Sequence, residues 1–382
     1  MSTPYISTAI VGSAHSSDIL GVEICNKFTI TCSSDGYLKF WNNRTSDRTL
    51  YNELLVDKIG LHHLAIFEDI IEMKKIFLIA TVSFSGKLYI FKYDDENDEN
   101  KLINLNFNPI NLGLKKNCSF WCPIFDSNID TNILTCTTVS GKTEIFNINF
   151  NNDNSNNNDE INFEYRGSLF ANDSSFATCI CSDITNNKIV VGHQNGNTYL
   201  YDFKQLLLSF NFESYGLKNS KSLNIVRSIK FSPNNNSELL AISIDSGPFG
   251  TISLYDVKYG EYLGSFTIST HSNNVGIGNF AHSKWCLSID FNEEGNKLVS
   301  CGLDNLIRIW DIESRSCTTM LKLNSTDLDD EEVNKLNDLD SSSCTNIRFV
   351  KKGIFNEDGQ NDGLVVVGFD RSIRWFREAG GI

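Results

Sequence analysis

Two places in the sequence combine a histidine, a hydroxyl side chain and an aspartate, the residue types of a hydrolytic triad. In each set a tryptophan follows six residues after the aspartate. The first set is His282, Ser300, Asp304 and Trp310, and the second is His15, Thr31, Asp35 and Trp41. Roles and geometry define a triad, and residue identity alone does not. Because the same types recur in the same order at similar spacing, we predict two hydrogen-bonded structural networks and no catalytic residue.

The cysteines could bind metal, yet their spacing argues against it. Cys179 and Cys181 form a C-x-C pair, and alternation along a strand would place both side chains on one face. A structural metal site needs third and fourth ligands at suitable spacing, and none is evident. The odd total of 11 cysteines is typical of a reducing compartment, where a thiol serves as a small buried hydrophobe. We predict no metal, no cofactor and an intracellular protein.

A repeat positions these residues. Its units share a glycine, or a substitute, followed five residues later by an aromatic: Gly36 to Trp41, Gly86 to Phe91, Gly141 to Phe146, Gly196 to Tyr201, Gly250 to Tyr255, Asn305 to Trp310 and Arg371 to Phe376. Successive aromatics lie 50 to 66 residues apart. Glycine favours a tight turn, and β-branched and aromatic residues alternate on both sides of it. Each unit is therefore a strand-turn-strand hairpin.

The best-preserved unit runs from Phe280 to Glu313. Alternation predicts four strands, at Cys286 to Phe291, Lys297 to Gly302, Leu306 to Asp311 and Cys317 to Leu323. Its histidine, serine, aspartate and tryptophan resemble the hydrogen-bonded tetrad of WD repeats. Seven such units predict an all-β fold, a seven-bladed WD40 β-propeller that forms a single domain over residues 1–382.

The last unit ends too near residue 382 to supply its own outer strand. Tyr5 to Val11 alternates and is rich in β-formers, so we predict that the N-terminal strand completes the last blade and removes an open edge. The expected boundaries are residues 2–14 for that strand, then 15–58, 59–110, 117–170, 174–213, 222–268, 280–324 and 344–378 for blades one to seven.

Two segments do not fit a blade. Residues 149–160 are rich in Asn and Asp, and residues 325–343 combine acidic residues with serine. We predict that both are solvated loops, the first between two strands of blade three and the second between blades six and seven. Leu328, Val333, Leu336 and Leu339 leave open a short amphipathic helix in the second segment.

Propellers bind ligands over a central funnel lined by the loops between blades and between their two middle strands. The expected residues of this face, which we call the top face, are mostly aromatic or apolar: Asp18, Leu20, Phe84, Trp121, Phe176, Trp285, Leu303, Phe369 and Arg371. Each aromatic could instead serve blade packing. Their joint placement favours an interface hot spot, at which Asp18 would accept an arginine of a partner.

The composition narrows the partners. The formal charge of −14 argues against direct nucleic-acid binding, which needs a clustered basic surface. The opening segment has no basic stretch, and its longest apolar run is too short for a signal peptide or a membrane span. We expect a protein-binding chain that does not bind membranes and is a monomer on its own.

Several segments closely resemble the WD-repeat subunit of the fungal superkiller (Ski) complex. They are AHSSDI at 14–19, SDGYLKFW at 34–41, GLHH at 60–63, TVSFSG at 81–86, SFW at 119–121, GNFAHSKW at 278–285 and DRSIRWFREAGG at 370–381. The resemblance spans every blade and both termini. The segments at 149–160 and 325–343 depart from it in composition.

The resemblance implies a non-catalytic scaffold in a cytoplasmic complex that feeds messenger RNA to the exosome for 3′-to-5′ decay, with an antiviral effect. It implies a tetratricopeptide scaffold and an RNA helicase as partners. It also implies a nuclear pool that associates with a topoisomerase-like protein of meiotic recombination. Both the scaffold and that protein would offer a Gln-Arg-x-x-hydrophobic motif to the top face.

Two other classes remain as alternatives. A G-protein β subunit would carry an N-terminal coiled-coil helix, and a ubiquitin-ligase substrate receptor would carry an F-box or similar module, whereas this sequence opens on a predicted strand. A propeller hydrolase would need polar groups converging in a pocket with perturbed pKa values. Turnover by the isolated chain would favour the hydrolase.

Overall fold

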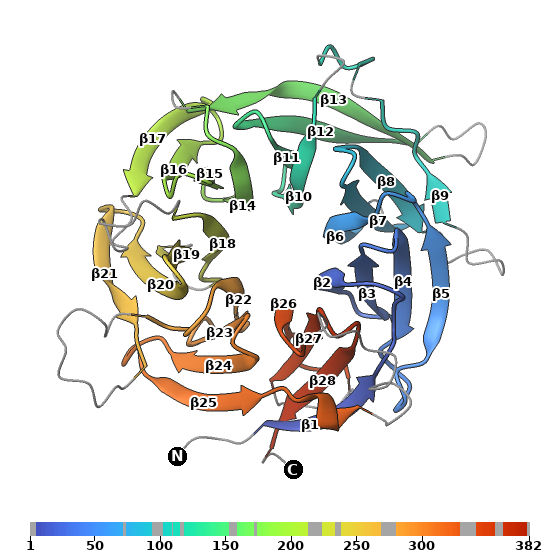
Figure 1. The fold of residues 1–382 in the computed structure, drawn as a ribbon. Coiled ribbons are helices and arrows are strands. Elements are labelled where there is room, and N and C mark those ends of the chain that lie inside the picture. The colour runs from blue at the N-terminus through green and yellow to red at the C-terminus, as the bar shows by residue number, and fades with distance from the viewer. Residues whose placement is uncertain are drawn as a thin grey trace.

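The computed structural model shows an all-β ring of seven four-stranded antiparallel sheets, the blades of a propeller (Figure 1). It describes residues 5–71, 74–93, 102–108, 110–114, 118–152, 159–171, 174–212, 224–233, 238–268, 280–328, 341–355 and 362–379. The predicted fold class is confirmed. In these residues no helix has the length and apolar character needed to cross a bilayer.

The blades follow one another along the chain, and each runs from an inner strand at the axis to an outer strand at the rim. Blade 1 has β2 (Ile19–Ile24), β3 (Phe28–Ser33), β4 (Tyr37–Asn42) and β5 (Leu50–Leu55), and blade 2 has β6 (Leu61–Ile71), β7 (Lys74–Ser83), β8 (Leu88–Tyr93) and β9 (Leu102–Asn104). Blade 3 has β10 (Phe120–Ser127), β11 (Asn132–Thr138), β12 (Lys142–Asn152) and β13 (Asp159–Phe170). Blade 4 has β14 (Ala177–Asp183), β15 (Lys188–His193), β16 (Thr198–Asp202) and β17 (Leu207–Phe212).

The remaining blades repeat the pattern. Blade 5 has β18 (Val226–Phe231), β19 (Leu239–Ser246), β20 (Phe249–Asp256) and β21 (Glu261–Phe266), and blade 6 has β22 (Cys286–Phe291), β23 (Lys297–Gly302), β24 (Leu306–Asp311) and β25 (Cys317–Lys322). Blade 7 has β26 (Cys344–Val350), β27 (Gly363–Gly368) and β28 (Ile373–Glu378), and its outer strand is β1 (Tyr5–Val11).

The two ends of the chain close the ring. β1 pairs antiparallel with β28, from Tyr5 opposite Glu378 to Val11 opposite Ile373, so the first and last strands of the chain lie side by side (Figure 1). The N-terminal closure predicted from the sequence is therefore confirmed. Pairing removes an open edge from β28, which could otherwise recruit a strand of another molecule.

An irregularity recurs at the start of every inner strand. In each blade the register between the first two strands shifts near the second residue of the inner strand, as between Leu61 and His63 in blade 2 and between Val226 and Ser228 in blade 5. A β-bulge re-aims the side chain at the extra position. The ring thus presents one bulged residue per blade beside its axis.

The core lies between neighbouring blades. One apolar cluster joins Phe67 and Leu78 of blade 2 to Phe120 and Phe146 of blade 3. Cys179 and Cys181 belong to the cluster between blades 4 and 5, and both are buried thiols. Each of the seven apolar clusters in the described residues lies between two neighbouring blades, so closing the ring buries apolar side chains of every blade.

The predicted loop at 149–160 is wrong in extent. β12 continues to Asn152 and β13 begins at Asp159, with pairing from Asn149 opposite Asn162 to Asn152 opposite Asp159. Backbone pairing with an adjacent strand overrides the weak strand propensity of Asn. The centre of the segment lies outside the described residues.

The segment at 325–343 also departs from a solvated loop where the structure describes it. A 3₁₀ turn, η2 (Ser325–Asp327), follows β25, and Leu328, Ser342 and Ser343 are buried. An apolar Leu328 next to the outer strand gains from leaving water. The short helix considered for this segment falls on residues outside the described ones, apart from Leu328.

Candidate protein-binding face

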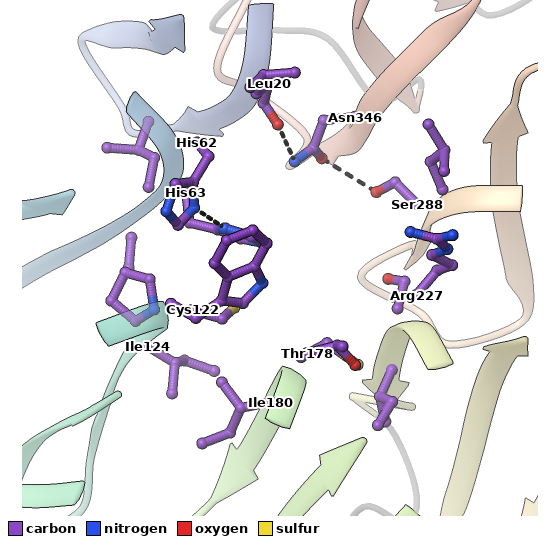
Figure 2. Close-up of a pocket in the computed structure, with 18 of the residues that line it drawn as sticks. Leu20, His62, His63, Cys122, Ile124, Thr178, Ile180, Arg227, Ser288 and Asn346 are labelled. Atoms are coloured by element: carbon purple, nitrogen blue, oxygen red, sulfur yellow. Dashed lines mark hydrogen bonds between the residues drawn. The ribbon is translucent and has the colours of Figure 1, made fainter. Parts of the chain in front are cut away.

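The seven bulged positions line a cavity at the top of the ring axis, on the side where the inner strands begin. Its volume is about 530 Å³. Leu20, His62, Trp121, Thr178, Arg227, Leu287 and Thr345 all contribute to the lining, and several of them surround the opening in Figure 2. The backbone bulge therefore turns one side chain of each blade toward the axis.

An aromatic wall covers one side of this cavity. The Trp121 ring stacks on His62 with centroids 4.1 Å apart, and its edge meets Phe176 at 4.9 Å. Phe84 lies 4.9 Å from His62 and is 47% exposed. Three blades thus contribute to one apolar surface that is open to solvent. Exposed aromatic clusters of this kind mark binding sites.

A histidine pair supports Trp121 from below. His62 and His63 approach through their Nδ1 atoms at 2.5 Å (Figure 2). His62 Nε2 lies 3.2 Å from the Ser83 carbonyl. The carbonyl can only accept, so His62 carries its proton on Nε2 and His63 donates from Nδ1. Burial lowers the pKa of His62 to about 4 and places that of His63 well below its usual range. Both rings are neutral at pH 7.

The opposite wall is charged. Arg227 donates to Asp245 through Nε at 2.9 Å and Nη2 at 2.7 Å, and its guanidinium lies 4.8 Å from the centre of the Trp285 ring. Trp285 in turn donates to the Gly247 carbonyl at 2.9 Å. These contacts fix Arg227 by both a carboxylate and an aromatic face, an arrangement that suits guanidinium.

Deeper in the channel a second ion pair ties the ring together across its closure. Arg348 of β26 donates to Glu23 of β2 through Nε and Nη2, at 3.0 and 2.7 Å, and its Nη1 donates to Asn346 at 2.8 Å. Asn346 also bonds Ser288, as Figure 2 shows. The upper cavity therefore has one aromatic wall and one charged wall, and the Arg348–Glu23 pair adds a rigid hydrogen-bonded group deeper in the channel.

The structure brings together part of the predicted top face. Among the nine residues expected there, the ones that line the cavity are Leu20, Phe84, Trp121, Phe176 and Phe369. Trp285 contacts the cavity through Arg227, whereas Asp18, Leu303 and Arg371 do not line it. The Asp18 carbonyl accepts from the Ser34 amide at 2.9 Å in the loop before β2, and the Leu303 amide donates to Trp285.

Sequence reasoning missed five of the seven bulged residues and the histidine that follows one of them. The five are His62, Thr178, Arg227, Leu287 and Thr345, and the neighbouring histidine is His63. One regularity could have found them, because each bulged residue is the second residue of an inner strand. The missed residues are mostly polar, and the search favoured aromatic and apolar types.

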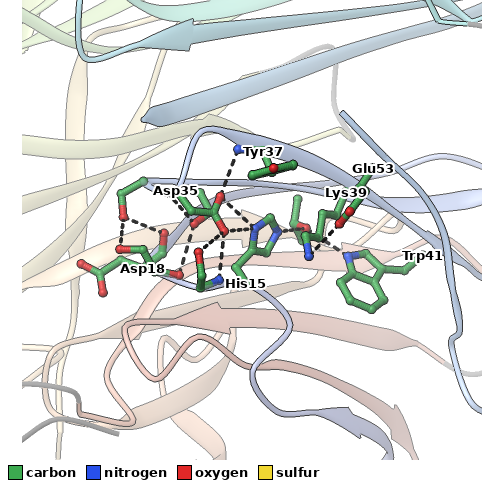
Figure 3. Close-up of polar contacts among 12 residues, drawn as sticks. His15, Asp18, Asp35, Tyr37, Lys39, Trp41 and Glu53 are labelled. Atoms are coloured by element: carbon green, nitrogen blue, oxygen red, sulfur yellow. Dashed lines mark hydrogen bonds and ion pairs between the residues drawn. The ribbon is translucent and has the colours of Figure 1, made fainter. Parts of the chain in front are cut away.

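The first histidine set forms a chain of contacts within blade 1 (Figure 3). His15 Nδ1 lies 3.0 Å from Asp35 Oδ2, His15 Nε2 lies 2.8 Å from Thr31 Oγ1, and Trp41 Nε1 donates to the same oxygen at 3.0 Å. The hydroxyl accepts from Trp41 and donates to His15, which leaves the Nδ1 proton for Asp35. Thr31 is fully buried, so a substrate could not reach its hydroxyl.

The second set repeats this geometry in blade 6. His282 lies 2.8 Å from both Asp304 Oδ1 and Ser300 Oγ, and Trp310 Nε1 donates to Ser300 at 2.8 Å. Burial lowers the pKa of His282, although the nearby charge of Asp304 acts to raise it. Burial alone would raise the pKa of Asp304, but His282 and Arg308 hold it at about 2. Both networks link the loop before a blade to its middle strands.

The comparisons with known proteins agree with this architecture. The WD domain, G-beta repeat family matches residues 268–311. The chain is 36% identical to the antiviral protein SKI8 of Saccharomyces cerevisiae over 402 aligned residues, which cover 100% of both chains. The chain belongs to the SKI8 family. As a SKI8-family member it is a WD40 propeller of a family that is generally non-catalytic.

A solved structure supports the fold of this SKI8-family chain. The WD40 β-propeller domain of Doa1 superposes with a TM-score of 0.62 at 14% identity and covers 98% of this chain and 97% of its own. In the described residues no group of three or more His, Cys, Asp or Glu side chains is placed to hold a metal ion.

Proposed function

We propose that this chain is a non-catalytic scaffold subunit of a superkiller complex and assists exosome-dependent 3′-to-5′ decay of messenger RNA in the cytoplasm. Its full-length relationship to SKI8 supports the pathway. The proposed partners are a tetratricopeptide scaffold subunit and an RNA helicase. The observation that carries a binding role is the aromatic wall of the axial cavity, formed by Phe84, Trp121 and Phe176.

The cavity suits a short segment with an apolar anchor. A hydrophobic side chain would pack against Trp121 and displace water from a surface that is already preorganised by stacking on His62. Truncation of such an anchor typically costs about 2 kcal/mol or more of binding free energy, or roughly thirtyfold in Kd. The Gln-Arg-x-x-hydrophobic motif implied by the family resemblance offers this anchor together with an arginine.

We propose that Asp18 accepts that arginine at the edge of the same face. A carboxylate takes a guanidinium through two parallel hydrogen bonds, and an amide cannot replace its charge. Asp18→Asn and Asp18→Ala should therefore weaken the affinity for the tetratricopeptide scaffold subunit by similar factors. Unchanged affinity of both variants would place the arginine elsewhere.

The decisive experiment is to purify the wild-type protein and the Trp121→Ala variant, each with its bound partners, by affinity from the native organism. We expect wild type to recover a helicase and a tetratricopeptide protein and the variant to lose both. Tyr259→Ala is the matched control, because Tyr259 is 65% exposed and lies away from the cavity. Equal recovery by all three proteins would move the binding site off the axial cavity. Circular dichroism melting checks that Trp121→Ala still folds.

A nuclear role in meiotic recombination is the finer part of the proposal. A topoisomerase-like partner that carries the same motif would compete with the tetratricopeptide scaffold for the top face. Mutually exclusive binding of the two purified partners to the chain is the expected result, and a ternary complex containing both would contradict a shared site.

A further inference from the structure

A second pocket lies on the face opposite the aromatic wall, where the inner strands end. Its lining comes from three successive blades: Asp126, Cys181, Ser182, Asp183, Asn186, Phe231, Ser232 and Pro233. Asp126 is near the end of β10, Asp183 ends β14 and Phe231 ends β18. The pocket has a volume of about 400 Å³ and shares no lining residue with the axial cavity.

The pocket is acidic. The charged residues among its described lining are Asp126 and Asp183, and both are carboxylates. Lys188 lies opposite Asp183 in the β14–β15 register but does not line the pocket. Burial raises the pKa of Asp126, and the nearby charge of Asp183 adds to the effect. A bound cation would offset both causes.

The acidic side chains are held in place by backbone groups. Asp126 accepts from the Ser127 amide at 2.8 Å and from the Ile184 amide of the next blade at 3.0 Å. Asp183 accepts from the Asn186 amide at 3.1 Å and from its side-chain nitrogen at 2.7 Å. These donors are neutral, so they orient the carboxylates without neutralising them. A carboxylate oxygen can accept two hydrogen bonds, which leaves Asp126 the capacity to bind a further donor.

A buried hydroxyl points to a ligand independently of the charges. Ser232 is 1% exposed, and its Oγ has no hydrogen-bond partner among the described residues. An unpaired buried hydroxyl costs free energy unless a donor or acceptor reaches it. Ser232 lines the pocket beside Phe231 and Pro233, which form an apolar wall. A ligand with several donors and a flat apolar face would satisfy both the polar and the apolar parts.

We propose that this pocket binds the guanidinium group of an arginine side chain from a partner protein. Guanidinium is planar, always charged and weakly hydrated, so it tolerates an apolar wall that a strongly hydrated ammonium does not. Its five donors match two carboxylates and a hydroxyl. The chain would then have a second docking point, on the face away from the aromatic wall, which goes beyond the proposed function.

The test titrates the full chain with acetyl-Gly-Arg-Gly-amide and follows the backbone amide resonances. We expect concentration-dependent shifts at Ile184 and Asn186, whose amides donate to the two carboxylates. The same peptide with citrulline, which keeps the shape and loses the charge, should leave them unmoved. Equal shifts with citrulline, equally tight binding of a lysine peptide, or no shift at millimolar peptide would each overturn the proposal.

Two variants locate the site. Asp183→Asn and Ser232→Ala should both weaken the arginine peptide, the former by about tenfold because a charge-assisted hydrogen bond becomes a neutral one. Trp121→Ala should bind it as wild type does, which separates this site from the top face. Unchanged peptide affinity in Asp183→Asn and Ser232→Ala would contradict the assignment, provided that both variants give the wild-type circular dichroism spectrum.

Discussion

Replacing Thr31 by valine isolates the hydrogen bonds of the blade 1 network. Valine keeps the shape of threonine and removes only the hydroxyl. Trp41 Nε1 and His15 Nε2, which lie 3.0 and 2.8 Å from that oxygen, would lose their partner inside a fully buried site. Each unpaired buried group costs about 1–3 kcal/mol, so Thr31→Val should lower the free energy of unfolding by about 4 kcal/mol.

Thr31→Ser is the matched control, since it keeps the hydroxyl and removes one methyl group. Burial of a methyl group is worth about 1 kcal/mol, so the serine variant should lose much less stability than the valine variant. Urea unfolding followed by tryptophan fluorescence measures both. A larger loss for Thr31→Ser than for Thr31→Val would refute the reasoning and make packing, in place of the hydrogen bonds, the main contribution of this residue.

Three further outcomes are expected. Asp304→Ala, which leaves His282 and Arg308 without their carboxylate, should lower the melting temperature while scaffold affinity at a permissive temperature stays near wild type. Burial lowers the pKa of His62 to about 4 from about 6.5 in the unfolded chain. The free energy of unfolding should therefore fall by about 3 kcal/mol as the pH drops from 6.5 to 4, because the unfolded chain takes up a proton that the folded chain does not. His62→Gln should reduce this pH dependence in urea unfolding measured at each pH. Deleting residues 1–11 should expose the β28 edge and produce oligomers in light scattering, whereas a monomer of unchanged stability would contradict closure by β1.

Strand positions follow from local pattern because alternation is a local property. The predicted inner and middle strands of blade 6 coincide with β22, β23 and β24, and the predicted N-terminal strand coincides with β1. Alternating apolar residues and a glycine or asparagine turn are sufficient signals there. The same logic failed at 149–160, where Asn-rich composition indicated a loop but pairing with a neighbouring strand extended β12 and β13.

The site was only partly predictable. Leu20 and Trp121 belong to the bulged set and were predicted by their place at strand starts, whereas Arg227 and His62 were not. A bulge changes where a side chain points without changing the residue type, so polar members gave no compositional signal. The contacts of Trp121 with His62 and Phe176 join side chains of three successive blades that are 55 or more positions apart in the sequence.

The sequence by itself determined the number of hairpins, most of their strands and the tetrad residues, because each depends on short-range spacing. Only the tertiary structure decided which residues meet at the axis, that Asp18, Leu303 and Arg371 stand outside the cavity, and that Asp126, Asp183 and Ser232 share a pocket on the far face. These contacts depend on the closure of the ring, which brings together the ends of strands from different blades. No local sequence pattern encodes the distances between those strand ends.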